Sequence, residues 1–288
     1  MKINDIIQLL VCPDCGAELK KNSDDIQCIS CGRVFEILHN NCINLLPSKK
    51  FIRTGKTEVE KRSIEIYNKL FDEPFTWKEN PLPWGLNISV NYQKKLHKHK
   101  YMVYKLIPES IECFCDISAG SGRFSWEIAK KSKLSILCDI SVDSAVYLSK
   151  KIINEGLNNI FVIRCDYLQP PFKENIFDVV LCNDTLIYGY EHEIRLLLSI
   201  YSILKSKDGQ TILDFSYKYH RGLWHKPYTF AYSKKNMIKM LQSVKFQIQD
   251  IIPLYYEFNK DLDEKRFMTK ILKYLLPPTR YLFKCVKG

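Results

Sequence analysis

From Ile111 onward, short apolar segments alternate with stretches of helical periodicity, and this alternation constrains the fold more than any other feature of the chain. The apolar segments read IECFCDI, LSILCDI, IFVIRCD, FDVVLCN and QTILDFS. The chain between them is long enough for a helix of roughly 10–15 residues. Parallel strands need a crossover connection of that length, so the pattern predicts an α/β fold, with a parallel sheet covered by helices on both faces.

The first apolar segment leads into a turn with two glycines. Ligands of parallel sheets bind beside the carboxyl ends of the strands. This segment ends at Asp116 and continues into ISAGSGRF, where Gly120 and Gly122 can adopt positive φ angles and let a ligand approach the backbone. The helix that follows presents its N-terminus to an anion. Paired glycines are common in turns, so this turn alone does not establish a cofactor site.

Polar residues also end the next three segments. Asp139 lies 23 residues after Asp116, where a carboxylate can accept hydrogen bonds from both hydroxyls of a ribose. Asp166 and Tyr167 end the third segment and are suited to the amino group and the ring face of an adenine. Asn183 ends the fourth segment beside the expected cleft. Together these residues predict a ligand that contains a nucleoside.

Four segments resemble the successive motifs of class I S-adenosylmethionine-dependent methyltransferases. They are FCDISAGSGRFSWEIA, LCDIS, CDYLQPPFKENIFDVVLCND and LKSKDGQTILDFSY, and the resemblance extends from about Ile111 to the end of the chain. It implies a Rossmann-like, seven-stranded methyltransferase sheet with helices on both faces. KFQIQDII and RYLFKCVKG would be its last two strands, one of them antiparallel. The resemblance also implies S-adenosylmethionine as the cofactor.

The resemblance assigns a role to each residue of these motifs. Asp116 and the glycine turn would hold the methionine portion of the cofactor, Asp139 the ribose, residues 166–167 the adenine, and Asn183 would line the site near the sulfonium. Ser118 stands where the family commonly has glycine, which is tolerable if Ser118 can adopt the local backbone conformation, and a serine hydroxyl is able to hydrogen-bond the cofactor. The expected cofactor-binding residues are Asp116, Ser118, Ala119, Gly120, Ser121, Gly122, Asp139, Ile140, Asp166, Tyr167 and Asn183.

A nicotinamide-binding domain is the rival interpretation of the same residues, because it too combines a glycine turn with an acidic residue for the ribose. Its fingerprint requires a third glycine, three residues after the second, for close packing of the helix. Ser125 occupies that position. The methyltransferase interpretation is therefore favoured.

Two Cys-x-x-Cys motifs, CPDCG and CISCG, lie in the first fifty residues with twelve residues between the inner cysteines. Each motif ends in a glycine, Gly16 or Gly32, which lets the backbone turn its amides toward the thiolates. This doubled spacing predicts a structural, tetrahedral Zn²⁺ site. The expected ligands are Cys12, Cys15, Cys28 and Cys31.

The same fifty residues resemble the zinc-ribbon family of small proteins that partner and activate tRNA and protein methyltransferases. A similar ribbon precedes the catalytic domain of bacterial ribosomal RNA guanine-N1 methyltransferases, where the fourth ligand is a histidine and not a cysteine as at Cys31. We expect three regions: a zinc ribbon at 1–50, a helical bridge or lid at 51–108, and a methyltransferase domain at 109–288. A substrate-side insertion is expected at about 217–232.

Catalytic side chains are harder to identify, because methyl transfer from a sulfonium depends mainly on alignment and on excluding water. A base is needed only if the acceptor carries a proton of high pKa. The candidates are His220 and His225, in the insertion. His97 and His99 lie in KKLHKHK, which is typical of a solvated basic helix face. NDTL at 183–186 argues against methylation of an exocyclic amine of adenine or of glutamine.

A net charge of +11 favours acidic partners without fixing one. Residues 217–288 carry 15 basic and 5 acidic groups, whereas residues 1–50 carry 6 of each, which argues against a ribbon that grips RNA phosphates. RFMTKILKYLL has the pattern of an interfacial helix, so peripheral contact with a lipid surface is a minor alternative. No segment reaches the roughly 18 apolar residues of a membrane span, and we expect a cytoplasmic protein.

The sequence therefore favours a methyltransferase that acts on a small-molecule or carrier-linked acceptor at oxygen, nitrogen or carbon. A ribosomal or transfer RNA methyltransferase is the alternative within the same class of enzyme. A second alternative is a non-catalytic binding module of the same fold that docks a partner through its zinc ribbon.

Overall fold

The computed structural model describes residues 2–38, 41–51, 58–83, 90–185, 193–217, 231–255 and 277–288. A single sheet of eleven strands runs through these residues in the order β1-β2-β3-β4-β7-β6-β5-β8-β9-β11-β10. The strands are β1 (Leu19–Lys21), β2 (Asp25–Cys28), β3 (Val34–Leu38), β4 (Cys42–Asn44), β5 (Cys113–Asp116), β6 (Leu134–Asp139), β7 (Ile160–Arg164), β8 (Val179–Cys182), β9 (Gln210–Ser216), β10 (Phe246–Leu254) and β11 (Arg280–Lys287).

Seven helices accompany the sheet in the part of the chain that the structure describes. They are α1 (Ile3–Ile7), α2 (Glu58–Asp72), α3 (Val90–Leu106), α4 (Trp126–Lys131), α5 (Val142–Asn154), α6 (Glu193–Ile203) and α7 (Lys234–Ser243). Ser141 and Ser233 cap α5 and α7, each accepting a hydrogen bond from a backbone N–H of the first turn. None of the described helices is long and apolar enough to cross a membrane.

The central strands confirm the parallel α/β expectation. β7, β6, β5, β8 and β9 run parallel, while β11 pairs antiparallel with both β9 and β10. The two segments expected as the last strands are thus β10 and β11, with β11 as the antiparallel member.

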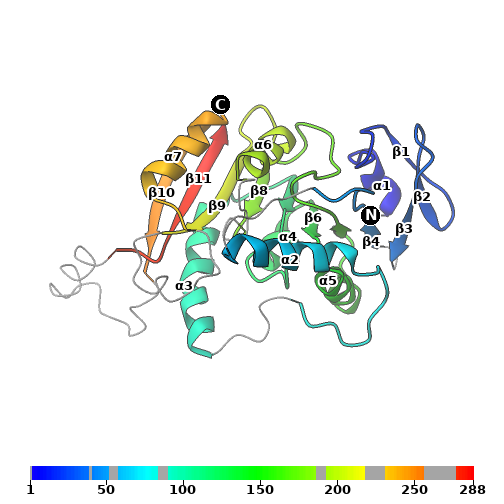
Figure 1. Ribbon diagram of the computed structural model, residues 1–288, viewed down its shortest axis with the longest axis horizontal. Coiled ribbons are helices and arrows are strands. Elements are labelled where there is room, and N and C mark those ends of the chain that lie inside the picture. Colours follow the sequence, from blue (N-terminus) through cyan, green and yellow to red (C-terminus); the bar gives the residue numbers. More distant parts are fainter. Residues whose placement is uncertain are drawn as a thin grey trace.

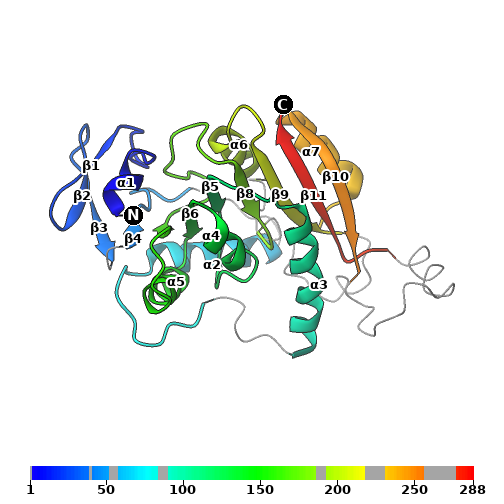
Figure 2. The ribbon, with the colours of Figure 1, turned by 180° about the vertical axis from the view of Figure 1, so that it is seen from behind.

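The predicted strand count of seven is wrong for the sheet as a whole. Seven strands, from β7 to β10, form the expected part, and four N-terminal strands extend it (Figures 1 and 2). β4 pairs in parallel with β7, so that Ile43 lies opposite Ile163, and β3 continues antiparallel to β4. The reason is physical: β7 would otherwise present unpaired N–H and C=O groups at an open edge, and β4 covers it.

Successive residues of the central strands face opposite sides of the sheet, as the two-residue period of a strand requires. Cys115, Ile136 and Leu213 join a buried cluster with Leu196 and Leu197 of α6. The residues next to them in the strands, Phe114, Leu137 and Ile212, join a second cluster that includes residues of α3, α4 and α5. Helices therefore cover both faces, as expected.

The cysteines outside the two Cys-x-x-Cys motifs are core residues. Seven such thiols are buried, and none of the eleven cysteines forms a disulfide. Burial raises the pKa of the Cys182 thiol above its ordinary value, so it stays protonated. The seven are Cys42, Cys113, Cys115, Cys138, Cys165, Cys182 and Cys285.

Candidate functional site

The glycine turn after β5 is folded tightly against the end of β6. The Ala119 N–H donates to the Cys138 carbonyl at 2.7 Å, and the Gly120 N–H donates to Asp139 Oδ2 at 2.7 Å. Gly120 and Gly122 have φ angles of 55° and 74°. A Cβ on Gly122 would lie 3.1 Å from Leu148 Cδ2 of α5, so a side chain there would be crowded as well as strained. The turn requires glycine at this position.

Asp139 ends β6 and lies beside the turn, as expected. Its Oδ2 accepts from Gly120 N, and its Oδ1 accepts from the N–H of Ser141 at 2.9 Å. An ionised carboxylate has about four lone-pair positions. Asp139 therefore keeps acceptor capacity for a ligand while its orientation is fixed by the backbone. Burial raises its pKa, although these backbone hydrogen bonds and Arg164 oppose the shift.

Asp116, at the end of β5, is almost entirely buried at 3% exposure. Its Oδ1 accepts from the N–H of Ser118 at 3.3 Å. Burial raises its pKa to about 7, because it outweighs the opposing hydrogen bond from the N–H of Ser118, and the charge of Asp139 acts in the same direction. A carboxyl group with this pKa changes its charge near neutral pH.

The end of β7 brings Asp166 into contact with the bridge region. Asp166 Oδ1 accepts from the N–H of Leu168 at 3.0 Å, and Oδ2 accepts from the hydroxyl of Tyr67 on α2 at 2.6 Å. Tyr167 is half-buried next to it. Ile140 packs with Leu46 and Tyr67 in a small apolar cluster. α2 therefore contacts the residues expected to hold the nucleoside.

Asn183 follows β8 and is held by α3. The Nε2–H of His99 donates to Asn183 Oδ1 at 3.2 Å, and the same nitrogen lies 3.9 Å from Asp214 Oδ2. His99 is fully buried and packs on Phe124, with ring centroids 4.5 Å apart. The expectation of a solvated His99 is wrong, whereas His97 is exposed. Burial lowers the pKa of His99, although Asp214 opposes the shift.

A buried ionic network adjoins Asn183 and was not predicted from the sequence. Arg280, at the start of β11, pairs with both Asp184 and Asp214, and the N–H of Asp184 donates to Asp214 Oδ1 at 2.6 Å. Asp184 has a φ angle of 60°, which is uncommon for a residue other than glycine. Arg123 of the glycine turn pairs with Asp184 at 2.8 Å. Opposite charges thus hold this backbone at the end of β8.

Ser118 also connects the glycine turn to the segment after β8. Its hydroxyl contacts the hydroxyl of Thr185, which in turn donates to the carbonyl of Asn183 at 3.1 Å. Ser118 is half-buried and Thr185 is buried. The serine that replaces the usual glycine therefore makes a side-chain contact that glycine could not make.

The four cysteines of the Cys-x-x-Cys motifs converge on one point. Their sulfur atoms all lie within 4.8 Å of one another, with 3.7 Å between Cys12 and Cys31 and 3.4 Å between Cys15 and Cys28. Sulfurs at about 2.3 Å from a tetrahedral Zn²⁺ would be about 3.8 Å apart, so the donor set fits that ion. Gly16 and Gly32 both have φ angles of 74°.

Backbone amides favour the thiolate form of at least one of these cysteines, Cys28. The N–H of Cys31 points at the sulfur of Cys28, at 3.4 Å. Burial raises the pKa of Cys28, but hydrogen bonds from the backbone of Cys31 and Ser30 and from Cys15 outweigh it and lower the pKa to about 6. The thiolate form, which is the metal ligand, is thereby favoured.

The N-terminal segment that carries the four cysteines is hydrogen-bonded to the segment that follows Asp166. The N–H of Val11 donates to the carbonyl of Pro171 at 3.0 Å, and the N–H of Lys173 donates to the carbonyl of Leu9 at 2.9 Å. The side chain of Gln169 donates to the carbonyl of Pro13, inside the first Cys-x-x-Cys motif. Direct hydrogen bonds therefore join the residues beside the four-cysteine site to the chain just after the expected adenine-binding residues.

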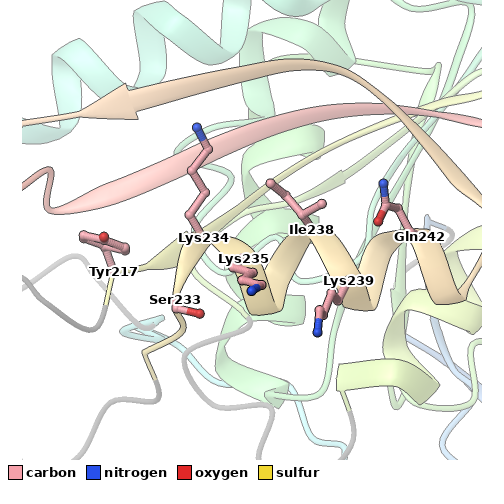
Figure 3. A pocket seen from close by; sticks show the side chains of 7 residues that line it. All are labelled: Tyr217, Ser233, Lys234, Lys235, Ile238, Lys239 and Gln242. Carbon is pink, nitrogen blue, oxygen red and sulfur yellow. The ribbon is translucent and has the colours of Figure 1, made fainter.

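A separate hollow lies along α7 (Figure 3). Three lysines contribute to it, and among the described residues no acidic side chain forms an ion pair with Lys235 or Lys239. Lys234 lies over the ring of Tyr281 at 5.4 Å. The lining residues are Tyr217, Ser233, Lys234, Lys235, Ile238, Lys239 and Gln242. This hollow contains none of the expected cofactor-binding residues.

His220 and His225, the candidate bases, lie outside the described residues, as does the RFMTKILKYLL segment.

Several residues that contact the site were not identified from the sequence. Arg164 and Asp214 are the single charges of β7 and β9, both of which are buried along their length, which is a signal that each needs a buried partner. His99 shares the spacing of Leu96 and Val103, which marks the buried face of α3. Tyr67 shares the spacing of Ile64 and Phe71 on α2, which marks it as buried but does not show which group its hydroxyl contacts.

Comparison with known proteins is consistent with this geometry. The family described as a methyltransferase domain matches residues 114–207, from β5 to the turn after α6. The chain is 32% identical over 108 residues to the ubiquinone/menaquinone biosynthesis C-methyltransferase UbiE of Wigglesworthia glossinidia brevipalpis, which covers 35% of this chain and 42% of that protein. It is 28% identical over 166 residues to the tRNA (guanine(37)-N(1))-methyltransferase Trm5b of Pyrococcus abyssi, and this match covers 56% of this chain and 47% of that protein. The chain spans less than half the length of either relative.

Solved structures share the fold at low sequence identity. The N-methyltransferase NodS of Bradyrhizobium japonicum, in complex with S-adenosylhomocysteine, matches with a TM-score of 0.53 and 11% identity, covering 77% of this chain and 97% of that chain. The cyclase SpnF matches with a TM-score of 0.56 and 13% identity, and this match covers 83% of this chain and 99% of that chain.

Proposed function

We propose that the protein is a class I methyltransferase that transfers a methyl group from S-adenosylmethionine to a small-molecule or carrier-linked acceptor, and the methyltransferase-domain family that matches residues 114–207 supports this proposal. The observation that carries the proposal is the arrangement of Asp116, Asp139 and Asp166 around the glycine turn. Asp116 and Asp139 end β5 and β6, and Asp166 follows β7 by two residues, so three carboxylates at the same edge of the sheet match the charges and hydroxyls of a methionine and a nucleoside.

The roles of the site residues follow from their positions. Asp116 would bind the ammonium of the methionine portion, and Asp139 would accept from the ribose hydroxyls. Asp166 would accept from the adenine amino group, with Tyr167 beside the ring. Asn183 would lie near the sulfonium, held by His99. In an enzyme of this kind the cofactor supplies an activated methyl group, and the chain supplies alignment and a dry site.

We assign Zn²⁺ as a structural ion of the four-cysteine site, because four thiolates at these separations leave no open position for a substrate. We also propose that the chain is divided into a ribbon at 1–50, a bridge at 51–108 and a methyltransferase domain at 109–288. The bridge helix α2 and the ribbon would complete the cofactor-binding side of the domain.

An RNA acceptor is the second candidate. The match to a tRNA methyltransferase and the lysines along α7 favour it. The test is the binding of tRNA to the protein at 50 and 200 mM salt, since phosphate contacts weaken steeply with added salt. Binding with a steep salt dependence would support this candidate, and no binding at 50 mM would exclude it.

Calorimetric titration with S-adenosylhomocysteine tests the proposed function directly. We expect one molecule to bind per chain. Because a cyclase shares this fold, cofactor binding alone does not demonstrate methyl transfer, and transfer of the methyl group should be measured as well. Radiolabelled S-adenosylmethionine should then label one fraction of a cell extract separated into RNA, lipid and small molecules. Absence of both binding and labelling would leave a non-catalytic binding module as the remaining interpretation.

The raised pKa of Asp116 predicts that cofactor binding depends on pH. Only the ionised carboxylate attracts the ammonium of S-adenosylhomocysteine, so affinity should strengthen as pH rises from about 5.5 to 7, by up to about tenfold per pH unit, and level off above 7. In the cofactor-free protein the sign is opposite: protonation favours the folded state, so this contribution to stability is present below about pH 4 and is lost as pH rises through 7.

The control is Asp116→Asn, which removes the titrating group. We expect weaker binding in this variant and little change in affinity between pH 5.5 and 8. The same pH dependence in the variant as in the wild-type protein would assign the titration to another group.

A further inference from the structure

We propose that Tyr67 of α2 is a positioning residue for the cofactor: its hydroxyl holds the Asp166 carboxylate in the orientation that selects an adenine amino group. The inference rests on the proposed function, which places adenine at Asp166. It assigns a specificity-determining role to a residue of the bridge, outside the methyltransferase domain that the family comparison covers.

The contact itself is short and buried. The Tyr67 hydroxyl donates to Asp166 Oδ2 at 2.6 Å, and it accepts from the N–H of Phe51 at 3.3 Å. Tyr67 is 5% exposed and Asp166 is 1% exposed. Because the N–H of Leu168 donates to the other oxygen, both oxygens of the carboxylate are fixed in direction. Each oxygen still has a lone pair for a further donor.

α2 is anchored independently of this hydrogen bond. Arg164, the last residue of β7, is 1% exposed, and its Nη2 donates to the carbonyl of Leu70 at 2.7 Å near the end of α2. Its Nε donates to the carbonyl of Ile140 at 3.0 Å. A guanidinium that binds terminal carbonyls satisfies groups with no partner in the helix and suits the negative end of its dipole. Tyr67 is therefore held in place by the fold and does not depend on its hydroxyl for position.

Apolar packing closes the same region to water. Tyr67 packs with Leu46 and Ile140, and its ring lies 5.8 Å from that of Phe71. Ile140 directly follows Asp139, so α2 covers both ends of the expected nucleoside site. If the carboxylate turned away from the base in such a buried site, water could not take over the hydrogen bond to the base. Loss of that hydrogen bond would therefore cost more binding free energy than loss of one at the surface.

The consequence is selectivity at one position of the base. A carboxylate that can only accept binds the 6-amino group of adenine and rejects the 6-oxo group of hypoxanthine, because two acceptors would face each other. The hydroxyl of Tyr67 fixes one carboxylate oxygen by donation and leaves the remaining lone pairs directed at the base. Without it, Asp166 can rotate, and the preference for the amino group should weaken.

The experiment compares two ligands that differ at that group, S-adenosylhomocysteine and S-inosylhomocysteine, by calorimetry on the full chain. We expect Tyr67→Phe to bind S-adenosylhomocysteine about tenfold more weakly. Its affinity for S-inosylhomocysteine should stay within about twofold of the wild-type value, so the preference for adenine narrows by about the same factor of ten. Tyr201→Phe is the matched control, because Tyr201 donates to the exposed terminal carbonyl of Gly288.

A second variant keeps the test informative if Tyr67→Phe is too unstable for calorimetry. Asp166→Asn presents an amide that can donate a hydrogen bond, so it should shift the binding preference toward S-inosylhomocysteine. Equal weakening of both ligands by Tyr67→Phe, or no weakening of either, would overturn the proposal. If the wild-type protein binds neither ligand, both the proposed function and the role of Tyr67 are refuted. If the wild-type protein binds S-adenosylhomocysteine and Tyr67→Phe keeps the wild-type preference for it over S-inosylhomocysteine, only the role of Tyr67 is refuted.

Discussion

Loss of one thiolate from the four-cysteine site is expected to destabilise the whole protein and not only its first fifty residues. Cys28 belongs to the same buried cluster as Phe35 of the ribbon and Phe161 of β7. β4 also completes the sheet next to β7. Structural Zn²⁺ contributes about 10–16 kcal/mol of apparent binding free energy in zinc-finger peptides, so Cys28→Ala should remove several kcal/mol of unfolding free energy.

Urea unfolding and metal analysis of Cys28→Ala measure this effect. The matched control is Cys285→Ala, which removes a buried thiol far along the sheet, on β11, and should cost roughly 1 kcal/mol. Hydrogen exchange should show faster exchange in β4, β7 and residues 165–173 of Cys28→Ala than of the control. One bound metal per chain in Cys28→Ala, or equal unfolding midpoints for the two variants, would contradict the assignment.

The positions of Asp116, Asp139 and the glycine turn at one edge of the sheet could be predicted because their signals are local. Asp116 and Asp139 each end an apolar segment, and the two-residue period of a strand with a following turn places such residues at one edge of a parallel sheet. The Cys-x-x-Cys motifs are local in the same sense, since the spacing within each pair already positions two sulfurs. The structure brings all of these groups to the expected places.

The groups that surround this edge could not be predicted, because distant segments supply them. Tyr67 reaches Asp166 from 99 residues away along the chain, and His99 reaches Asn183 from 84 residues away. Their partners depend on how α2 and α3 pack, which no periodicity encodes. β4, with three residues, is too short for its pattern to show that it joins β7. Arg280 and Asp214 were detectable only as charges that need a partner.

Asp139→Ala is expected to weaken binding of S-adenosylhomocysteine by at least about 100-fold. Each hydrogen bond from a ribose hydroxyl to this carboxylate should contribute about 1.5–3 kcal/mol, and two of them would be lost together. The variant also leaves the N–H groups of Gly120 and Ser141 without their acceptor, so the glycine turn should lose part of its order. Calorimetry gives the affinity, and the thermal unfolding midpoint shows how much of the loss is structural.

Two further variants separate those causes. Asp139→Asn retains an oxygen that one backbone N–H can use, and we expect it to bind more tightly than Asp139→Ala but more weakly than the wild-type protein. Asp250→Ala removes an exposed carboxylate from β10 and should leave affinity unchanged. An Asp139→Ala protein with wild-type affinity would show that the ribose is bound elsewhere. An affinity that falls in step with the unfolding midpoint in both Asp139 variants would assign the residue to the turn and not to the ligand.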